Sequence, residues 1–138
     1  MTSPLPGGCR LIPFAARGDD RGKLVAIEQQ ADIPFAIARI YTIYDTAPGT
    51  IRGLHAHHAL DQVAVAVAGS CTMLLDDGRS RATVRLDDPA AAITLPPMVW
   101  HEMSDFSPDC VLMVVASAPY DEADYIRDYA EFQALTAA

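Results

Sequence analysis

The chain has 138 residues, a length that suits one domain with a core of its own. With 51% hydrophobic and 20% charged residues, its composition excludes a disordered chain. The net charge of −8 argues against nonspecific binding to nucleic acids or to anionic membranes. A ligand that carries phosphates would therefore need a local cluster of arginines.

The cysteines and the hydrophobic runs indicate a cellular compartment. Cys9, Cys71 and Cys110 are odd in number and form no C-x-x-C pair, which suits a reducing environment. The N-terminus lacks a basic stretch followed by an apolar run, the pattern of a signal peptide. No apolar run approaches the roughly 20 residues of a membrane helix. We expect a soluble cytoplasmic protein.

Short runs of strand-forming residues alternate with turn signals along the chain, which predicts an all-β fold. The expected strands are residues 23–28, 35–44, 52–57, 62–68, 71–75, 81–86, 91–95 and 110–117. The turn Asp77-Gly78 predicts a hairpin, and Pro96-Pro97 must end the strand before it. The last strand is almost wholly apolar, which indicates burial on both of its faces.

The C-terminal segment has a different period. From Asp121 onward, apolar side chains recur at steps of three and four residues, which predicts one amphipathic helix within 121–138. Asp121 and Glu122 suit its N-cap and first turn. The expected apolar stripe, which we assign to packing, is Tyr125, Ile126, Tyr129, Phe132 and Leu135.

The third expected strand carries the most informative motif. His55 and His57 are two residues apart, so both side chains point to the same face of a sheet. With Gly49, Gln62 and Gly69 they form the pattern G-x5-H-x-H-x4-Q-x6-G, which resembles the first motif of the cupin barrels. Metal-binding cupins carry a glutamate at the position of Gln62.

A version of the second cupin motif follows. Residues 96–101 match P-x-G-x2-H, with Met98 in the glycine position, and Asp105 replaces the usual asparagine. His101 is therefore expected to join His55 and His57 inside the barrel. The resemblance implies a cupin jelly-roll barrel that forms a single domain over residues 1–138.

The strand 62–68 predicts where a ligand would fit. Its alternation places Gln62 and the alanines 64, 66 and 68 on one face, and valines on the other. Small side chains inside a barrel leave room for a ligand, so we expect a cavity beside the histidines. The alternative is that the alanines match bulky residues opposite.

A cluster of three histidines permits two kinds of chemistry. With Gln62 it could hold a divalent transition metal, although a neutral amide is a weak ligand. Without metal, an imidazole with a pKa near ~6.5 can take and give protons at neutral pH. Moving a proton between carbons next to a carbonyl needs a base, an acid and a donor to the enediolate oxygen.

Several short segments together resemble one family, the sugar 3,4-ketoisomerases, over about residues 20–135. They are LVAIE at 24–28, IPF at 33–35, GLHAHH at 53–58, VWHEM at 99–103, DFS at 105–107 and DYIRDY at 124–129. The resemblance implies conversion of dTDP-4-keto-6-deoxyglucose to a dTDP-3-keto-6-deoxyhexose, without metal or cofactor. It also implies a homodimer that exchanges N-terminal strands. It further implies that a PLP-dependent aminotransferase, which makes amino sugars for surface glycans or natural products, uses the product.

The resemblance also implies roles for individual residues. His55 matches the base that removes the C3 proton, and His57 has a supporting acid–base or orienting role. Tyr41 matches a tyrosine that passes protons or binds sugar oxygens. Arg52 is expected to bind the diphosphate, for which a guanidinium fork is well shaped. Gln62 is expected among the substrate-binding residues.

Each role has a structural alternative. Arg52 could be a surface ion-pair partner, and Tyr41 a core residue with its hydroxyl at the rim. His58 should be solvated on the opposite face. Glu102 and Asp105 could orient His101 or merely cap a turn.

The family has two branches, which differ in the configuration of the product at C4. Arg21, also expected to bind substrate, and His101 resemble the branch that forms the galacto product. A protonated His101 opposite the base would deliver hydrogen to that face. Other possible functions are a metal-dependent cupin oxygenase or isomerase and a noncatalytic sugar-binding cupin.

Overall fold

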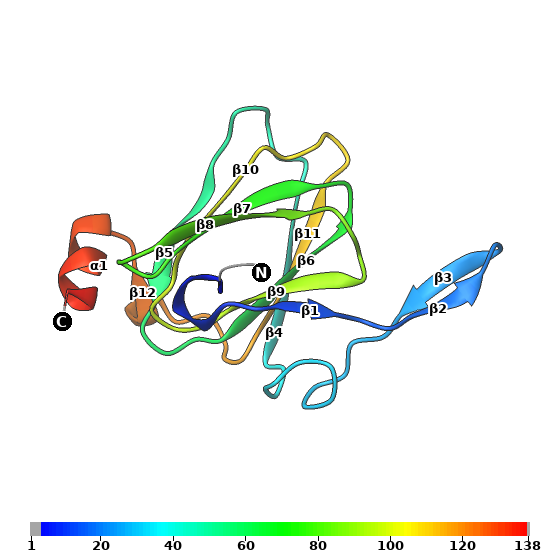
Figure 1. Ribbon diagram of the computed structural model, residues 1–138, viewed down its shortest axis with the longest axis horizontal. Coiled ribbons are helices and arrows are strands. Elements are labelled where there is room, and N and C mark those ends of the chain that lie inside the picture. Colours follow the sequence, from blue (N-terminus) through cyan, green and yellow to red (C-terminus); the bar gives the residue numbers. More distant parts are fainter. Residues whose placement is uncertain (1–3, 138) are drawn as a thin grey trace.

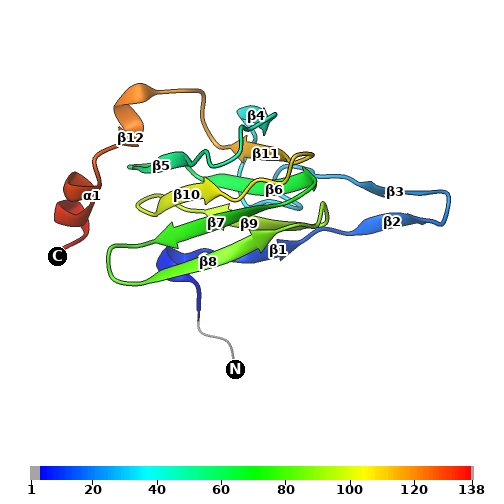
Figure 2. The ribbon, with the colours of Figure 1, turned by 90° about the horizontal axis from the view of Figure 1, so that it is seen from above.

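Two five-stranded antiparallel sheets form a jelly-roll barrel in the computed structural model, which describes residues 4–137 (Figures 1 and 2). The all-β cupin-like fold expected from the sequence is confirmed. The first sheet has the order β1 (Leu11–Pro13), β9 (Ala91–Leu95), β6 (Gln62–Ala68), β11 (Val111–Ala116) and β4 (Arg39–Tyr44). The second has the order β12 (Tyr125–Ile126), β5 (Arg52–His57), β10 (Trp100–Ser104), β7 (Cys71–Asp76) and β8 (Arg81–Leu86).

The main hydrophobic core lies between these sheets. It joins Leu112 and Ile93 of the first sheet to Met73 and Leu75 of the second. The other face of the first sheet is covered by the N-terminal segment, through residues such as Phe14 and Ile33. Strands β6 and β11 are therefore buried on both faces, which explains their almost continuous apolar sequences.

The alanines of β6 do not form the predicted cavity wall. Ala64 and Ala66 are fully buried and pack in the main core against bulkier residues such as Leu112. The small side chains thus compensate for large neighbours, because interiors are filled to crystal-like density. The cavity beside the histidines is lined by other strands.

A two-stranded hairpin, β2 (Ala16–Asp19) and β3 (Gly22–Val25), projects away from the barrel (Figure 2). Strand β2 was not among the expected strands. The strand predicted at 23–28 ends at Val25, and the strand predicted at 35–44 starts only at Arg39. The hairpin makes its backbone hydrogen bonds within itself and leaves nearly every side chain exposed.

The predicted C-terminal helix begins later than expected. The segment 121–138 contains a short 3₁₀ helix, η2 (Glu122–Asp124), then β12, and only then α1 (Tyr129–Thr136). Tyr125 and Ile126 pair with β5, because an edge strand offered backbone partners that the helical period did not reveal. The aromatic stripe packs as predicted at Phe132, which is fully buried against Trp100.

Strand β10 was not predicted, because its sequence WHEMS lacks a strand-like alternation. Before it, Met98 adopts a φ of 62°, so the position where the cupin motif has glycine is left-handed here as well. A further 3₁₀ turn, η1 (Pro6–Gly8), precedes β1. Within residues 4–137 no helix is long and apolar enough to cross a membrane.

Candidate active site

Strands β5 and β10 are neighbours, and their pairing places His101 directly opposite His55. The ring centroids of these two residues are 4.6 Å apart, and those of His55 and His57 are 4.9 Å apart. All three side chains are nearly inaccessible to solvent. The histidine cluster predicted from the two motifs is therefore present inside the barrel.

A local distortion of β5 orients His55. Gly53 and Leu54 both have left-handed backbones, with φ of 83° and 57°. This turns the Gly53 carbonyl so that it lies 2.9 Å from His55 Nδ1. Gly53 also allows close approach to β10, because an added Cβ would lie 2.8 Å from the carbonyl oxygen of His101.

Backbone carbonyls fix the tautomers of two histidines. Only a protonated Nδ1 can donate to the Gly53 carbonyl, which leaves Nε2 of His55 as a proton acceptor. His101 makes the corresponding contact with the Val99 carbonyl at 3.3 Å. Nε2 of His55 is buried and has no partner among the described residues. An unpartnered buried nitrogen of this kind is suited to bind or deprotonate a ligand.

Burial keeps the cluster neutral. Burial lowers the pKa of His55, and it lowers the pKa of His101 to about 3, with a further contribution from His55. The pKa of His57 falls to about 4 through burial and the nearby His55, against the opposing effect of Asp124. At neutral pH the three imidazoles are free bases, the state in which they can accept a proton.

Tyr41 is held by the residue that replaces the cupin glutamate. The Gln62 amide donates to the Tyr41 hydroxyl at 2.8 Å, so the hydroxyl proton of Tyr41 remains free to bind another acceptor. Burial raises the pKa of Tyr41, which keeps it protonated. Gln62 is itself 2% exposed and lies beneath Tyr41, so it acts on the site through that tyrosine.

A cavity of about 330 Å³ opens beside His55 and Tyr41. Three arginines border it: Arg39 from β4, Arg52 from β5 and Arg127 after β12. We call it the arginine-lined cavity. It meets the requirement for a local positive cluster in a chain of net charge −8.

Tyrosines and a carboxylate hold two of these arginines. The Arg39 guanidinium lies 5.2 Å from the ring centroid of Tyr41, and that of Arg127 lies 4.2 Å from the ring of Tyr125. Arg127 also pairs with Glu122 at 2.7 Å.

Sequence reasoning missed Arg39 and Arg127. Arg39 is two residues before Tyr41 on one strand, so the period of two could have identified it. Arg127 was hidden by the assignment of its segment to a helix.

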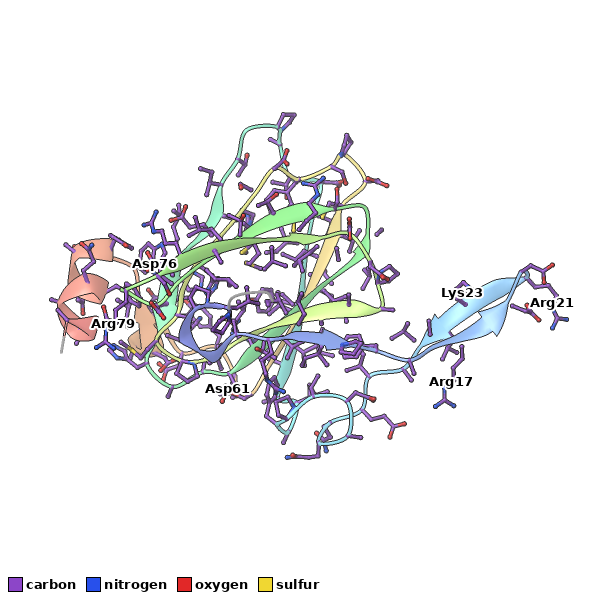
Figure 3. The ribbon with its side chains drawn as sticks, in the orientation of Figure 1. Arg17, Arg21, Lys23, Asp61, Asp76 and Arg79 are labelled. Atoms are coloured by element: carbon purple, nitrogen blue, oxygen red, sulfur yellow. The ribbon has the colours of Figure 1, made fainter. Side chains whose placement is uncertain are left out.

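Other predicted residues lie outside the cavity. Arg21 is at the tip of the β2–β3 hairpin, where it pairs with Asp19 and projects away from the barrel (Figure 3). His58 is exposed, as predicted. Glu102 accepts from the Trp100 indole, and Asp105 pairs with Arg85, so neither orients His101.

The histidine cluster does not form a complete metal site with other side chains of residues 4–137. Within this range, no group of three or more His, Cys, Asp or Glu side chains is placed to hold a metal ion. The Gln62 amide, the fourth ligand considered from the sequence, is turned toward Tyr41.

Residues 7–137 match the WxcM-like, C-terminal family (FdtA). The chain belongs to this family. The TDP-4-oxo-6-deoxy-alpha-D-glucose-3,4-oxoisomerase of Aneurinibacillus thermoaerophilus is 52% identical over 124 residues, which cover 90% of this chain and 89% of that protein.

Two solved structures are similar over almost the whole chain. A 3,4-ketoisomerase from Helicobacter canadensis is 42% identical, with a TM-score of 0.90, and the match covers 94% of this chain and 98% of that one. A mutant of the 3,4-ketoisomerase QdtA from Thermoanaerobacterium thermosaccharolyticum, in complex with TDP-4-keto-6-deoxyglucose, is 37% identical, with a TM-score of 0.93 and 96% of each chain covered. The chain is thus an isomerase of the sugar 3,4-ketoisomerase family.

Proposed function

We propose that the protein converts dTDP-4-keto-6-deoxyglucose to a dTDP-3-keto-6-deoxyhexose by proton transfer within the histidine cluster, without a metal. The observation that carries this proposal is His55, a neutral base with an unpartnered Nε2, beside the arginine-lined cavity. The names of the relatives support the substrate, since one is a TDP-4-oxo-6-deoxyglucose isomerase and another was crystallised with that sugar nucleotide.

The reaction moves two protons and needs no external oxidant. His55 Nε2 takes the proton from C3, and the electrons of the C–H bond form the C3–C4 double bond of an enediolate, with negative charge on O4. A proton is then added to C4, the proton of the O3 hydroxyl passes to O4, and C3 becomes the ketone. A positioned base typically contributes ~10²–10⁴-fold to such a step.

Tyr41 and the arginines complete the proposed site. With its oxygen already accepting from Gln62, the Tyr41 hydroxyl donates to the sugar oxygen that becomes negative. Arg52 is exposed at the cavity, and its guanidinium fork suits the diphosphate, with Arg39 and Arg127 beside it. Gln62 contributes to substrate binding through Tyr41.

We propose that the active form is a homodimer in which the N-terminal strands are exchanged. This would explain the position of Arg21, because a hairpin that projects from its own barrel can reach the cavity of a second copy. Such a dimer has two equivalent sites. The product would pass to a PLP-dependent sugar aminotransferase in the cytoplasm.

The product is proposed to have the galacto configuration at C4, because Arg21 and His101 resemble that branch. His101 is buried beside His55, with ring centroids 4.6 Å apart, and is not among the residues that line the arginine-lined cavity. Its effect on the configuration at C4 would therefore act through His55.

The configuration of the product tests this assignment. The purified protein is incubated with dTDP-4-keto-6-deoxyglucose, and the proton NMR spectrum of the product is recorded. A 3-keto sugar with a small coupling between the C4 and C5 protons supports the galacto product. A large axial coupling would assign the gluco product, and unchanged substrate would refute the ketoisomerase function.

A further inference from the structure

The histidine cluster has one carboxylate in direct contact with it among residues 4–137. Asp124 Oδ2 lies 3.1 Å from Nδ1 of His57. Glu122 influences His55 only from a distance, and it is already paired with Arg127. The proton transfers proposed above use no carboxylate, so the role of Asp124 needs a separate explanation.

Asp124 is held firmly against the turn that follows β5. Its carboxylate accepts from the backbone amides of Ala59, at 2.9 Å, and Leu60, at 3.2 Å. Its own carbonyl accepts from the amide of His58 at 3.0 Å. Four hydrogen bonds thus fix this side chain and its backbone relative to the end of β5, while only 18% of the side chain is exposed.

This contact differs from those of the other two histidines. His55 and His101 donate Nδ1–H to neutral carbonyls, whereas His57 donates it to a charged group. A carboxylate on Nδ1–H fixes the tautomer and stabilises an imidazolium when the ring takes a proton. Nε2 of His57 is buried and has no partner among the described residues, so it is available to accept one.

A negative charge near His57 would stabilise a protonated imidazole in the histidine cluster. Arg39 lies on β4, Tyr125 on β12, and His55 and His101 on β5 and β10, so none of these groups supplies one at neutral pH. A proton taken from the sugar would place a positive charge in this buried group. In a medium of low dielectric constant, a carboxylate in contact with the cluster strongly stabilises that charge.

We propose that Asp124 is a positioning residue of the isomerase, which holds His57 as the Nδ1–H tautomer and serves as counter-ion while the histidine cluster carries the proton taken from the sugar. This inference rests on the proposed function. Asp124 does not contact the substrate in this account and acts through His57.

Steady-state kinetics test the proposal with a matched pair of variants. Asp124→Asn removes the charge at nearly constant size, and we expect kcat to fall by about 10²–10⁴-fold, the contribution of a correctly protonated acid–base group. KM and the affinity for TDP should change little. The control is Asp121→Asn, three residues earlier, whose carboxylate accepts from the Ala123 amide and has no hydrogen bond with a histidine among residues 4–137. Its kcat should equal that of the wild type.

A spectroscopic measurement separates positioning from folding. Imidazole ¹⁵N NMR of the wild type should show His57 protonated at Nδ1 and bare at Nε2, and Asp124→Asn should shift these signals. A wild-type His57 protonated at Nε2, or an Asp124→Asn variant with unchanged kcat, would overturn the proposal. Loss of TDP binding together with kcat, with the His57 signals unmoved, would show a purely structural role and would also overturn it.

The two proposals can fail separately. If the wild type does not isomerise the sugar nucleotide, the proposed function fails, while the ¹⁵N signals of the wild type still decide whether Asp124 fixes the tautomer. If Asp124→Asn does not fold, the wild-type spectrum still decides whether Asp124 fixes the tautomer, and kcat of Asp124→Glu, which keeps the charge, replaces the missing kinetic comparison.

Discussion

At the scale of single residues, burial keeps the three histidines of the two cupin-like motifs neutral. Gln62 occupies the position of the usual glutamate and binds Tyr41. The histidines donate Nδ1–H to Gly53, Asp124 and Val99. Nε2 of His55 and of His57 is buried and has no partner among the described residues. The hydrogen bond made by one ring nitrogen of a histidine determines which nitrogen remains free to react.

The lowered pKa of His55 predicts the pH dependence of turnover. Because burial lowers this pKa below 6.5, the base stays neutral at pH values where an exposed histidine is half protonated. The value of kcat/KM should therefore remain level as pH falls through 6.5, and decline only below it. A decline centred at or above pH 6.5 would show that a group with an ordinary pKa limits the reaction.

At the scale of secondary structure, Gly53 of β5 allows this strand to pack closely against β10. Gly53→Ala would force a left-handed alanine and place its Cβ 2.8 Å from the His101 carbonyl. We expect a loss of about 1–3 kcal/mol in the free energy of unfolding, and a lower kcat, because His55 and His101 would move apart. Urea unfolding and steady-state kinetics measure the two effects.

The control for this prediction is Gly49→Ala. Gly49 has a similar φ of 80°, but its Cβ would meet nothing within 4 Å. The Gly49→Ala variant therefore has the strain of a left-handed alanine but no steric clash. If the two variants lost stability and kcat equally, the contact between β5 and β10 would not be what matters at Gly53.

The elements that the sequence predicted well share one property. Turn residues mark the ends of these strands, and all of them belong to the two sheets of the barrel. The strands with the expected bounds are 52–57, 62–68, 81–86 and 91–95. The predictions were wrong where the secondary structure of a segment depends on a strand far away in the sequence. Tyr125 became a strand residue because β5 offered a free edge, and its aromatic spacing also fitted a helix.

The sequence predicted the part of the site that depends on local spacing and missed the part that depends on long-range strand pairing. The two motifs located His55, His57 and His101, because each motif fixes a spacing within one strand. Arg127 and Asp124 reach the site through the pairing of β12 with β5. Their segment, DYIRDY, contributed to the family resemblance but did not indicate that pairing. The misplaced helix concealed both.

At the scale of the whole molecule, the buried histidines link stability to pH. His101 has a pKa of about 3 when folded and an ordinary value near ~6.5 when unfolded, so the unfolded chain binds more protons between these limits. The free energy of unfolding should fall as pH decreases below 6.5, by about 1.4 kcal/mol per pH unit from this residue. Urea unfolding of His101→Gln should show a smaller slope. The exposed His58→Gln should keep the wild-type slope, and a steep slope in both variants would contradict this account.

The proposed dimer can be tested by complementation. Arg21→Ala and His55→Asn should each be nearly inactive. If Arg21 serves the partner's cavity, a co-expressed mixture forms heterodimers in which one of two sites is intact, and about a quarter of the wild-type activity returns. No recovery would place Arg21 in the site of its own chain, and a fully active Arg21→Ala would remove it from the site.

The proposed function requires that the histidine cluster move the proton without metal. Its most direct test is proton NMR of dTDP-4-keto-6-deoxyglucose with the purified protein and a strong chelator in D2O. We predict that the 3-keto sugar forms in the chelator at the same rate, and to the same equilibrium ratio, as without it, with a proton or a deuteron now bound at C4. Loss of activity in the chelator, restored by added metal, would contradict the account and make the three histidines a metal site.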